Sequence, residues 1–172
     1  MSFVSVLTTD FDSHRIEGFT REGGHQFSVP LFSPIDENLW MGGCPRGEAP
    51  PQFDTIICLY THEPYSLHQN QVHLSVDMRD GPMVPDVAML EMLADTVNRA
   101  RERGTVLVHC QAGLNRSGLI TALALIRSSK YAPDAAIAHL RERRCDAVLC
   151  NAAFAKWLMD QAQPKTLEDD FE

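Results

Sequence analysis

The sequence predicts an α/β fold in which helices pack on a mostly parallel sheet. Two observations indicate this class. Residues 56–59 and 106–108 are short, uninterrupted apolar runs, which are typical of strands buried on both faces. Apolar residues then recur at three- and four-residue steps after each loop, the spacing of amphipathic helices. From residue 72 onward the order is strand, loop, helix, strand, loop, helix, which predicts a parallel strand pair joined by a right-handed crossover.

The size and charge of the chain limit what it can be. A chain of 172 residues that is 44% hydrophobic suits one domain, which we expect at residues 1–164, followed by an acidic tail at 165–172. The formal net charge of −8 argues against a broad nucleic-acid or anionic-membrane surface. Any affinity for phosphate must therefore be local.

The cysteine pattern and the amino terminus predict a location. Five cysteines form no Cys-x-x-Cys pair, and an odd number at irregular spacing fits a reducing compartment better than a disulfide framework. The first residues lack a basic segment followed by a long apolar run, and no stretch reaches membrane-spanning length. We expect a cytoplasmic protein without a membrane partner. Scattered His and Cys residues show no metal-ligand spacing, so neither a metal nor another cofactor is expected.

The first half of the chain predicts strands and polar loops. Residues 1–38 mix β-formers with prolines and polar turns, and we expect a short hairpin or a covering loop there. Residues 38–43 predict an edge strand that ends in glycines, and residues 53–60 predict a second, buried strand. Residues 61–71 form a polar loop with His62, Glu63, Tyr65 and His68. Residues 72–78 alternate and predict a third strand.

The middle of the chain predicts a crossover helix. Pro85 and Asp86 suit the first turn of a helix, because proline fits that position and a carboxylate complements the helix dipole. The inner face of this helix carries Leu90, Leu93, Val97 and Ala100, and Gly104 ends it. The helix leads directly into the strand at 106–108.

The loop at residues 110–116 combines a nucleophile with an anion site. If these residues curl around one point, their backbone N–H groups form a nest for a tetrahedral oxyanion, and the following helix adds its positive end. Gly113 permits the curl, and Arg116 can hold two oxygens with its planar guanidinium. The same field would lower the pKa of Cys110 below about 8.5. We therefore expect a thiolate at the bottom of a phosphate-binding loop.

The pattern His-Cys-x-x-Gly-x-x-Arg-Ser-Gly at residues 109–118 resembles the signature of the cysteine-dependent protein tyrosine phosphatases. Ala112 and Gly113, together with the short chain, resemble the dual-specificity branch. The resemblance implies a three-layer α/β/α fold around a central, mostly parallel sheet of four to five strands. It also implies a phosphoprotein phosphatase that hydrolyses phosphotyrosine monoesters through a cysteinyl-phosphate, with phosphoserine and phosphothreonine monoesters as further candidate substrates.

The resemblance assigns roles to single residues. Cys110 is the nucleophile, Asp80 the general acid and then base, and Ser117 a hydrogen-bond donor to the departing thiolate. His109 orients the loop without touching substrate. The substrate phosphate would bind the loop residues Gln111, Ala112, Gly113, Leu114, Asn115 and Arg116. The partners implied are a phosphorylated protein or peptide and, in the loop, a phosphate or similar oxyanion.

Two aspartates compete for the role of the acid. Asp80 precedes Gly81 and Pro82 and lies about thirty residues before the cysteine, as the acid does in the family. Asp77 is expected to lie still on the third strand. We favour Asp80, because a loop can close on a substrate and a strand cannot.

The C-terminal third predicts two more helices. One begins at Pro133 and ends with Arg141, Arg143 and Arg144, which we interpret as solvated charges that suit the helix dipole, although one of them could reach a second acidic group of a substrate. Asn151 caps the last helix, which Pro164 ends. Cys150 stands where many members of the family have proline.

Several alternatives remain open at this point. RNA 5′-triphosphatases resemble the chain through Asn115, although Gln111 and Ala112 replace the Thr-His that they usually carry. A phosphopeptide-binding module without turnover, an inositol-lipid phosphatase and a sulfur transferase are further candidates. Cys58 is expected to be a buried thiol, and the resemblance adds a second reading, a disulfide with Cys110 under oxidation.

Overall fold

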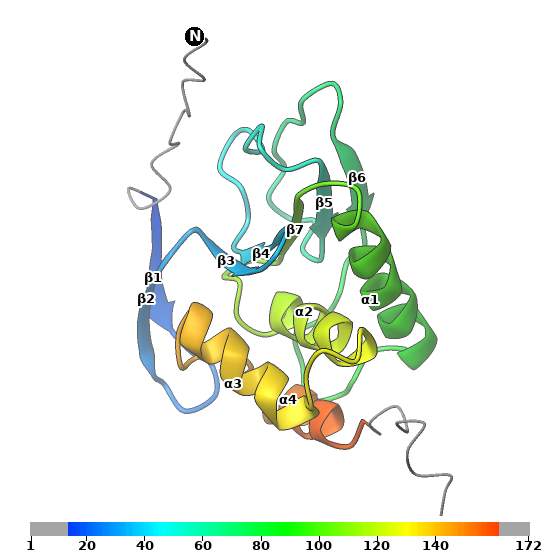
Figure 1. Cartoon of the computed structure of the whole chain (residues 1–172). Helices are drawn as coiled ribbons and strands as arrows, with labels where there is room; N and C mark the ends of the chain where they lie inside the picture. The colour runs from blue at the N-terminus through cyan, green and yellow to red at the C-terminus, as the bar shows by residue number, and fades with distance from the viewer. Residues whose placement is uncertain (1–13, 162–172) are drawn as a thin grey trace, which may run out of the picture.

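The computed structural model describes residues 14–161 (Figure 1). The elements of this part of the chain are, in order, β1 (Arg15–Phe19), β2 (Gln26–Pro30), β3 (Phe32–Asp36), β4 (Leu39–Gly42), β5 (Thr55–Cys58), β6 (Val72–Ser75), α1 (Val87–Arg101), β7 (Val106–His109), α2 (Arg116–Arg127), α3 (Pro133–Arg143) and α4 (Ala152–Met159). The predicted order of strands and helices is confirmed.

A five-stranded sheet forms the centre of the molecule, with the strand order β3-β4-β7-β5-β6. The pairs β4–β7, β7–β5 and β5–β6 are parallel, and only the edge pair β3–β4 is antiparallel. The expectation of an edge strand at residues 38–43 is wrong, because β4 pairs with both β3 and β7. All four residues of β7 are buried, as expected for an apolar strand between two parallel neighbours. The predicted α/β class and the mostly parallel sheet are therefore confirmed.

The two faces of the sheet are covered differently. One face packs on the helices, and α2 lies between α1 and α3 beneath the sheet (Figure 1). On the other face, a smaller cluster of buried residues forms around Phe53, Ile56 and Leu107. Within residues 14–161, that second face is covered by the loops before β5 and β6, through Ala49, Phe53 and Tyr65, and Ile16 of β1 packs against the same cluster. The outer layer on this face is thus made of loops, where the expected α/β/α arrangement has helices.

The amino-terminal hairpin is a separate small sheet. β1 and β2 pair antiparallel from Arg15↔Pro30 to Phe19↔Gln26. Their turn carries Gly23 and Gly24, both with positive φ, which glycine adopts without steric cost. The hairpin predicted for residues 1–38 is present, while residues 1–13 of that prediction lie outside the described residues.

Element ends differ slightly from the prediction. The third strand ends at Ser75, so Asp77 lies in the loop that follows it. Asp86 caps α1 by accepting a hydrogen bond from the Met89 N–H, and the helix ends at Arg101. α4 ends at Met159, before Pro164, and the predicted tail at 165–172 lies outside the described residues. None of the helices within residues 14–161 has the length and apolarity needed to cross a bilayer.

Candidate active site

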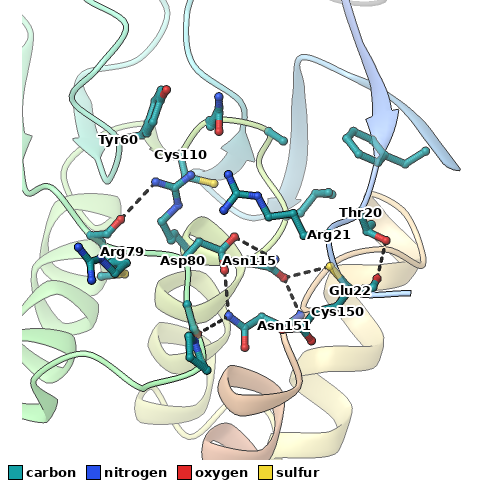
Figure 2. Close-up of a pocket in the computed structure, with 18 of the residues that line it drawn as sticks. Thr20, Arg21, Glu22, Tyr60, Arg79, Asp80, Cys110, Asn115, Cys150 and Asn151 are labelled. Carbon is teal, nitrogen blue, oxygen red and sulfur yellow. Dashed lines mark hydrogen bonds between the residues drawn. The ribbon is translucent and has the colours of Figure 1, made fainter. Parts of the chain in front are cut away.

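A cavity of about 680 Å³ opens where the parallel strands end (Figure 2). The segment after β7 contributes Cys110 and Arg116, the segment after β5 contributes Tyr60, and the segment after β6 contributes Asp80. The hairpin turn adds Arg21 from the other side. The carboxyl ends of parallel strands meet at one edge of a sheet, which is why residues distant in sequence converge here.

The loop at residues 110–116, hereafter the cysteine loop, is held tightly against the end of β4. The Cys110 N–H donates to the Gly42 carbonyl at 3.2 Å, and the Cys44 N–H donates to the Gln111 carbonyl at 3.0 Å. Gly113 has φ +70°, and a Cβ at this position would lie 2.3 Å from the carbonyl carbon of Gly42. The loop therefore requires glycine here for two reasons, its backbone angle and its close approach to β4.

The thiol of Cys110 lies in a field that favours its ionised form. The residue is 2% exposed and lines the cavity. Burial acts to raise the pKa of Cys110, but the positive charge of Arg116, the Ser117 hydroxyl and the N–H groups of Ser117 and Leu114 outweigh it and hold that pKa below its usual value. The Ser117 Oγ lies 3.3 Å from the sulfur, beneath the cavity floor.

Arg116 is the first residue of α2, and it lines the cavity. It is 8% exposed, donates to the Met78 carbonyl at 3.2 Å and lies over the Tyr60 ring, with 4.9 Å from Cζ to the ring centre. Its Nε is buried and has no hydrogen-bond partner among the described residues. A buried donor of a cation left unpaired is costly, so this group is suited to an anionic guest.

Five of the six predicted loop residues line the cavity, namely Gln111, Ala112, Leu114, Asn115 and Arg116. Gly113 is not among the residues that line it, and instead packs on Gly42 behind the loop. The side chain of Asn115 is directed to protein partners: its amide nitrogen donates to Asp80, and its oxygen accepts from the Asn151 N–H.

Asp80 is held in the cavity by two amide groups (Figure 2). The Asn115 Nδ2 donates to one carboxylate oxygen at 3.0 Å, and the Asn151 Nδ2 donates to the other at 2.8 Å. Each oxygen keeps a second lone pair on which a proton can reside. Asn151 also donates to the Gly81 carbonyl and thereby fixes the loop that carries the acid.

Asp77 lines the same cavity but is more exposed than Asp80 and has a different partner. It lies beyond the end of β6, so the expectation that it is still on the strand is wrong. Its side chain is 55% exposed and pairs with His62 at 3.5 Å. The distinction between the two aspartates now depends on their partners, since both belong to the loop after β6.

His109 supports the cysteine loop from behind. Burial lowers the pKa of His109 to about 4, so the ring is neutral at neutral pH. Its Nδ1 lies 3.2 Å from the Cys110 carbonyl, which can only accept, and this assigns the proton to Nδ1. Nε2 then accepts from the Tyr65 hydroxyl at 2.7 Å, and His73 Nε2 lies 3.0 Å from the same hydroxyl. His62, in the same polar loop as Tyr65, lines the cavity.

Arg144 has a structural role that the sequence did not reveal. The interpretation of this arginine as a solvated charge is wrong, because it is buried and extends from the end of α3 to the cysteine loop. It donates to the carbonyls of Gly113 at 2.7 Å and Ala112 at 3.0 Å, and also to Pro30 and Ser33. Burial lowers the pKa of Arg144 to about 10. Three arginines in one helix end look alike in sequence, and no pattern marks the one that turns inward.

The cysteines have separate environments. All five cysteines lie within residues 14–161, and none of them forms a disulfide there. Cys58 pairs in register with His109 across the sheet, and its thiol donates to the Tyr60 carbonyl at 3.1 Å. Cys150 lines the cavity, and burial raises the pKa of its thiol. A buried free thiol is what was expected of Cys58.

Known proteins resemble this chain in sequence. The family model for the dual specificity phosphatase catalytic domain matches residues 45–163. A putative tyrosine phosphatase of Invertebrate iridescent virus 6 is 30% identical over 130 residues, covering 72% of this chain and 87% of the viral protein. A protein tyrosine phosphatase domain-containing protein of Danio rerio is 34% identical over 82 residues, and a phosphatidylglycerophosphate phosphatase of Arabidopsis thaliana is 25% identical over 131 residues. The matched regions are 42% and 76% of this chain and only 12% and 37% of those two proteins.

Solved structures share the fold. The structure of Tk-PTP in its active form has a TM-score of 0.62 and 26% identity, over 77% of this chain and 99% of that one. A human tyrosine phosphatase-like serine/threonine/tyrosine-interacting protein has a TM-score of 0.66 at 21% identity, over 75% of this chain and 93% of that one. The match of the family model covers well over half of the chain and includes the whole cysteine loop. The chain therefore belongs to the dual specificity phosphatase catalytic domain family.

Proposed function

We propose that this protein is a phosphoprotein phosphatase that hydrolyses phosphotyrosine, and also phosphoserine or phosphothreonine, monoesters through a cysteinyl-phosphate. One observation carries the proposal. A thiol whose pKa is held low lies at the floor of a cavity, beside a buried guanidinium whose Nε has no partner among residues 14–161. A phosphate dianion would supply the missing acceptor and place its phosphorus within reach of the sulfur.

The first step is the transfer of the phosphoryl group to sulfur. The Cys110 thiolate attacks phosphorus, so that an S–P bond forms as the P–O bond to the leaving group breaks. Arg116 and the N–H groups of the cysteine loop stabilise the charge on the equatorial oxygens. Asp80 gives its proton to the leaving oxygen, which departs as a neutral alcohol or phenol.

The second step regenerates the enzyme. Asp80, now a carboxylate, removes a proton from a water molecule, whose oxygen attacks phosphorus as the S–P bond breaks. Inorganic phosphate is released, and Cys110 returns to its thiolate form. Ser117 can donate a hydrogen bond to the departing sulfur, because its Oγ lies 3.3 Å away. Asn115 and Asn151 keep Asp80 in position for both proton transfers.

The walls of the cavity support a preference for an aromatic ester. Phe19, Phe27 and Tyr60 all line it, and aromatic side chains favour a flat ring between them. The five free cysteines and the need for a reduced nucleophile support a cytoplasmic location. The domain at residues 1–164 and the roles of Gln111, Ala112, Gly113 and Leu114 in binding phosphate belong to the same proposal.

The direct test is a substrate panel on the purified protein. It compares a phosphotyrosine peptide, a phosphothreonine peptide, phosphatidylglycerophosphate and a triphosphorylated RNA. We expect the highest kcat/KM for the phosphotyrosine peptide. A higher value for the lipid, the kind of substrate named for the Arabidopsis relative, or for RNA would contradict the proposal. Binding of the peptide without turnover would indicate a binding module.

Variants test the assigned roles within the same assay. Cys110→Ser should abolish turnover and leave the fold intact, whereas Cys145→Ser, a thiol that does not line the cavity, should retain wild-type activity. Asp80→Asn should lower kcat by roughly 10²-fold or more, the range for loss of a general acid. A greater loss from Asp77→Asn would transfer the role of the acid to Asp77.

A further inference from the structure

The hairpin turn adds an arginine to the catalytic cavity, which Arg116 and Arg79 also line. Arg21 lies at the turn between β1 and β2 and lines the same cavity as Cys110. Figure 2 shows its side chain extending from the turn toward Cys110, on the side of the cavity away from Tyr60 and Arg79. The mechanism proposed above makes no use of this group.

Arg21 has no partner in the part of the chain that the structure describes. Among residues 14–161 it forms neither a hydrogen bond nor an ion pair. Three carboxylates line the same cavity, but each has another partner. Asp80 accepts from Asn115 and Asn151, Asp77 pairs with His62, and Glu22 accepts from the Ala152 N–H. The guanidinium is therefore available to an anion that enters from outside.

Hydrogen bonds hold the backbone on both sides of Arg21. The Thr20 hydroxyl donates to the Glu22 carbonyl at 2.7 Å and accepts from the His25 N–H at 2.9 Å, which closes the turn. The Glu22 carboxylate accepts from the Ala152 N–H at 3.0 Å and so attaches the turn to the start of α4. Because its backbone is held, Arg21 loses little freedom when it binds an anion, apart from that of its own side chain.

The hairpin lies outside the part of the chain that the family model matches. That match begins at residue 45, whereas β1 and β2 span residues 15–30. The hairpin also contributes Phe19, which is 71% exposed and lines the cavity. An exposed ring beside a cation on one wall suits a peptide chain, whose successive side chains can use both.

We propose that Arg21 makes this protein selective for phosphopeptides that carry an acidic side chain next to the phosphorylated residue. The inference rests on the function proposed above. The cysteine loop and Arg116 suffice for the phosphate that is transferred, so the charge of Arg21 remains for a second anionic group at the hairpin wall. Neither Cys110 nor Asp80 depends on Arg21 for its contacts, and the chemistry itself should not require it.

The test separates recognition from chemistry. Wild type and Arg21→Ala are compared on p-nitrophenyl phosphate and on two phosphotyrosine peptides that differ only in a flanking Glu or Gln. We expect Arg21→Ala to lower kcat/KM about three- to tenfold for the Glu peptide, and to change it less than twofold for the Gln peptide and for p-nitrophenyl phosphate. Arg103→Ala, which makes the same charge change at an exposed site outside the cavity, should leave all three values unchanged.

Charge reversal gives the sharper result. Arg21→Glu should invert the preference, so that a peptide with a flanking Lys becomes a better substrate than the Glu peptide. An equal loss on all three substrates would show that Arg21 binds the transferred phosphate, and no loss on any would show that it binds nothing; either result overturns the inference. A stronger effect of Arg21→Ala on a phosphorylated lipid headgroup than on the Glu peptide would also overturn it. If wild type hydrolyses none of these substrates, the proposed function itself fails.

Discussion

The ionisation of Cys110 depends on a balance between burial and charge. A thiolate buried to this degree would ordinarily take up a proton, because low dielectric surroundings disfavour the charged form. The guanidinium of Arg116 opposes this effect, together with the Ser117 hydroxyl and two backbone N–H groups. A sequence motif can predict such an arrangement, because each contributor lies within seven residues of the cysteine. Local spacing alone can bring such groups together.

Alkylation of Cys110 measures that balance directly. We expect iodoacetamide to modify Cys110 with a pH midpoint below about 8.5, the value of a free thiol. Arg116→Ala removes a positive charge, which favours the neutral thiol, so the midpoint should move up by about 1–2 pH units. The rate is read by mass spectrometry of the peptide that contains Cys110, because the variant is expected to lack activity.

The control for this prediction is Arg103→Ala, which removes the same charge at an exposed site outside the cavity. Its midpoint should equal that of wild type. If Arg116→Ala and Arg103→Ala gave the same profile as wild type, the field of Arg116 would not be the cause of the low pKa of Cys110.

At the scale of elements, the start of α4 connects stability to catalysis. The Asn151 oxygen accepts from the Ala153 and Phe154 N–H groups and caps the helix, while its amide nitrogen donates to Asp80. The sequence predicted the cap from the residue type. It gave no sign of the second contact, because Asp80 is 71 residues away and only the tertiary fold brings the two together.

Removal of the Asn151 side chain should therefore have two effects. Asn151→Ala should lower the free energy of unfolding by about 1–2 kcal/mol, through the lost cap, and lower kcat about tenfold, because Asp80 loses one of its two donors. Asp86→Ala removes the cap of α1 at a site outside the cavity and should cost similar stability with unchanged kcat. Urea unfolding and steady-state kinetics measure both quantities. Equal kcat in the two variants would mean that Asn151 serves the helix alone.

The end of α3 supports the cysteine loop through Arg144. Arg144→Lys keeps the positive charge, but an ammonium group cannot reach the four acceptors that the guanidinium spans. Buried carbonyls then lose their donors, and we expect a loss of about 2–4 kcal/mol in the free energy of unfolding. Arg143→Lys, at the exposed neighbouring position, should change it by less than about 0.5 kcal/mol. Similar values for both variants would contradict the bracing role of Arg144.

For the whole molecule, the sequence predicted those features that depend on local pattern. Apolar runs located β5 and β7, and the motif located the cysteine loop, because the neighbours of each residue in sequence determine these features. The loop cover over Ile56 and Leu107 was missed, since loops have no period that distinguishes covering the sheet from solvation. The contribution of Arg21 was missed for a related reason. The sequence pattern of a hairpin turn indicates which residues lie at its tip, but not which cavity their side chains line.

The C-terminal boundary of the domain can be tested by shortening the chain. The last core side chains of the described residues are Phe154 and Leu158, both fully buried, and α4 ends at Met159. The family model matches as far as residue 163. A chain that ends at residue 164 keeps all of these groups. We expect its free energy of unfolding to lie within about 0.5 kcal/mol of wild type.

Activity should follow the same boundary. Shortening to residue 164 removes four carboxylates and one lysine, but screening at physiological salt limits their effect beyond about 8 Å, so kcat/KM should change less than twofold. A chain that ends at residue 157 is the matched comparison, because it also loses Leu158 and should be destabilised by about 2–5 kcal/mol. If both truncations cost the same stability, residues 165–172 would contribute to the folded domain, and its boundary would lie beyond residue 164.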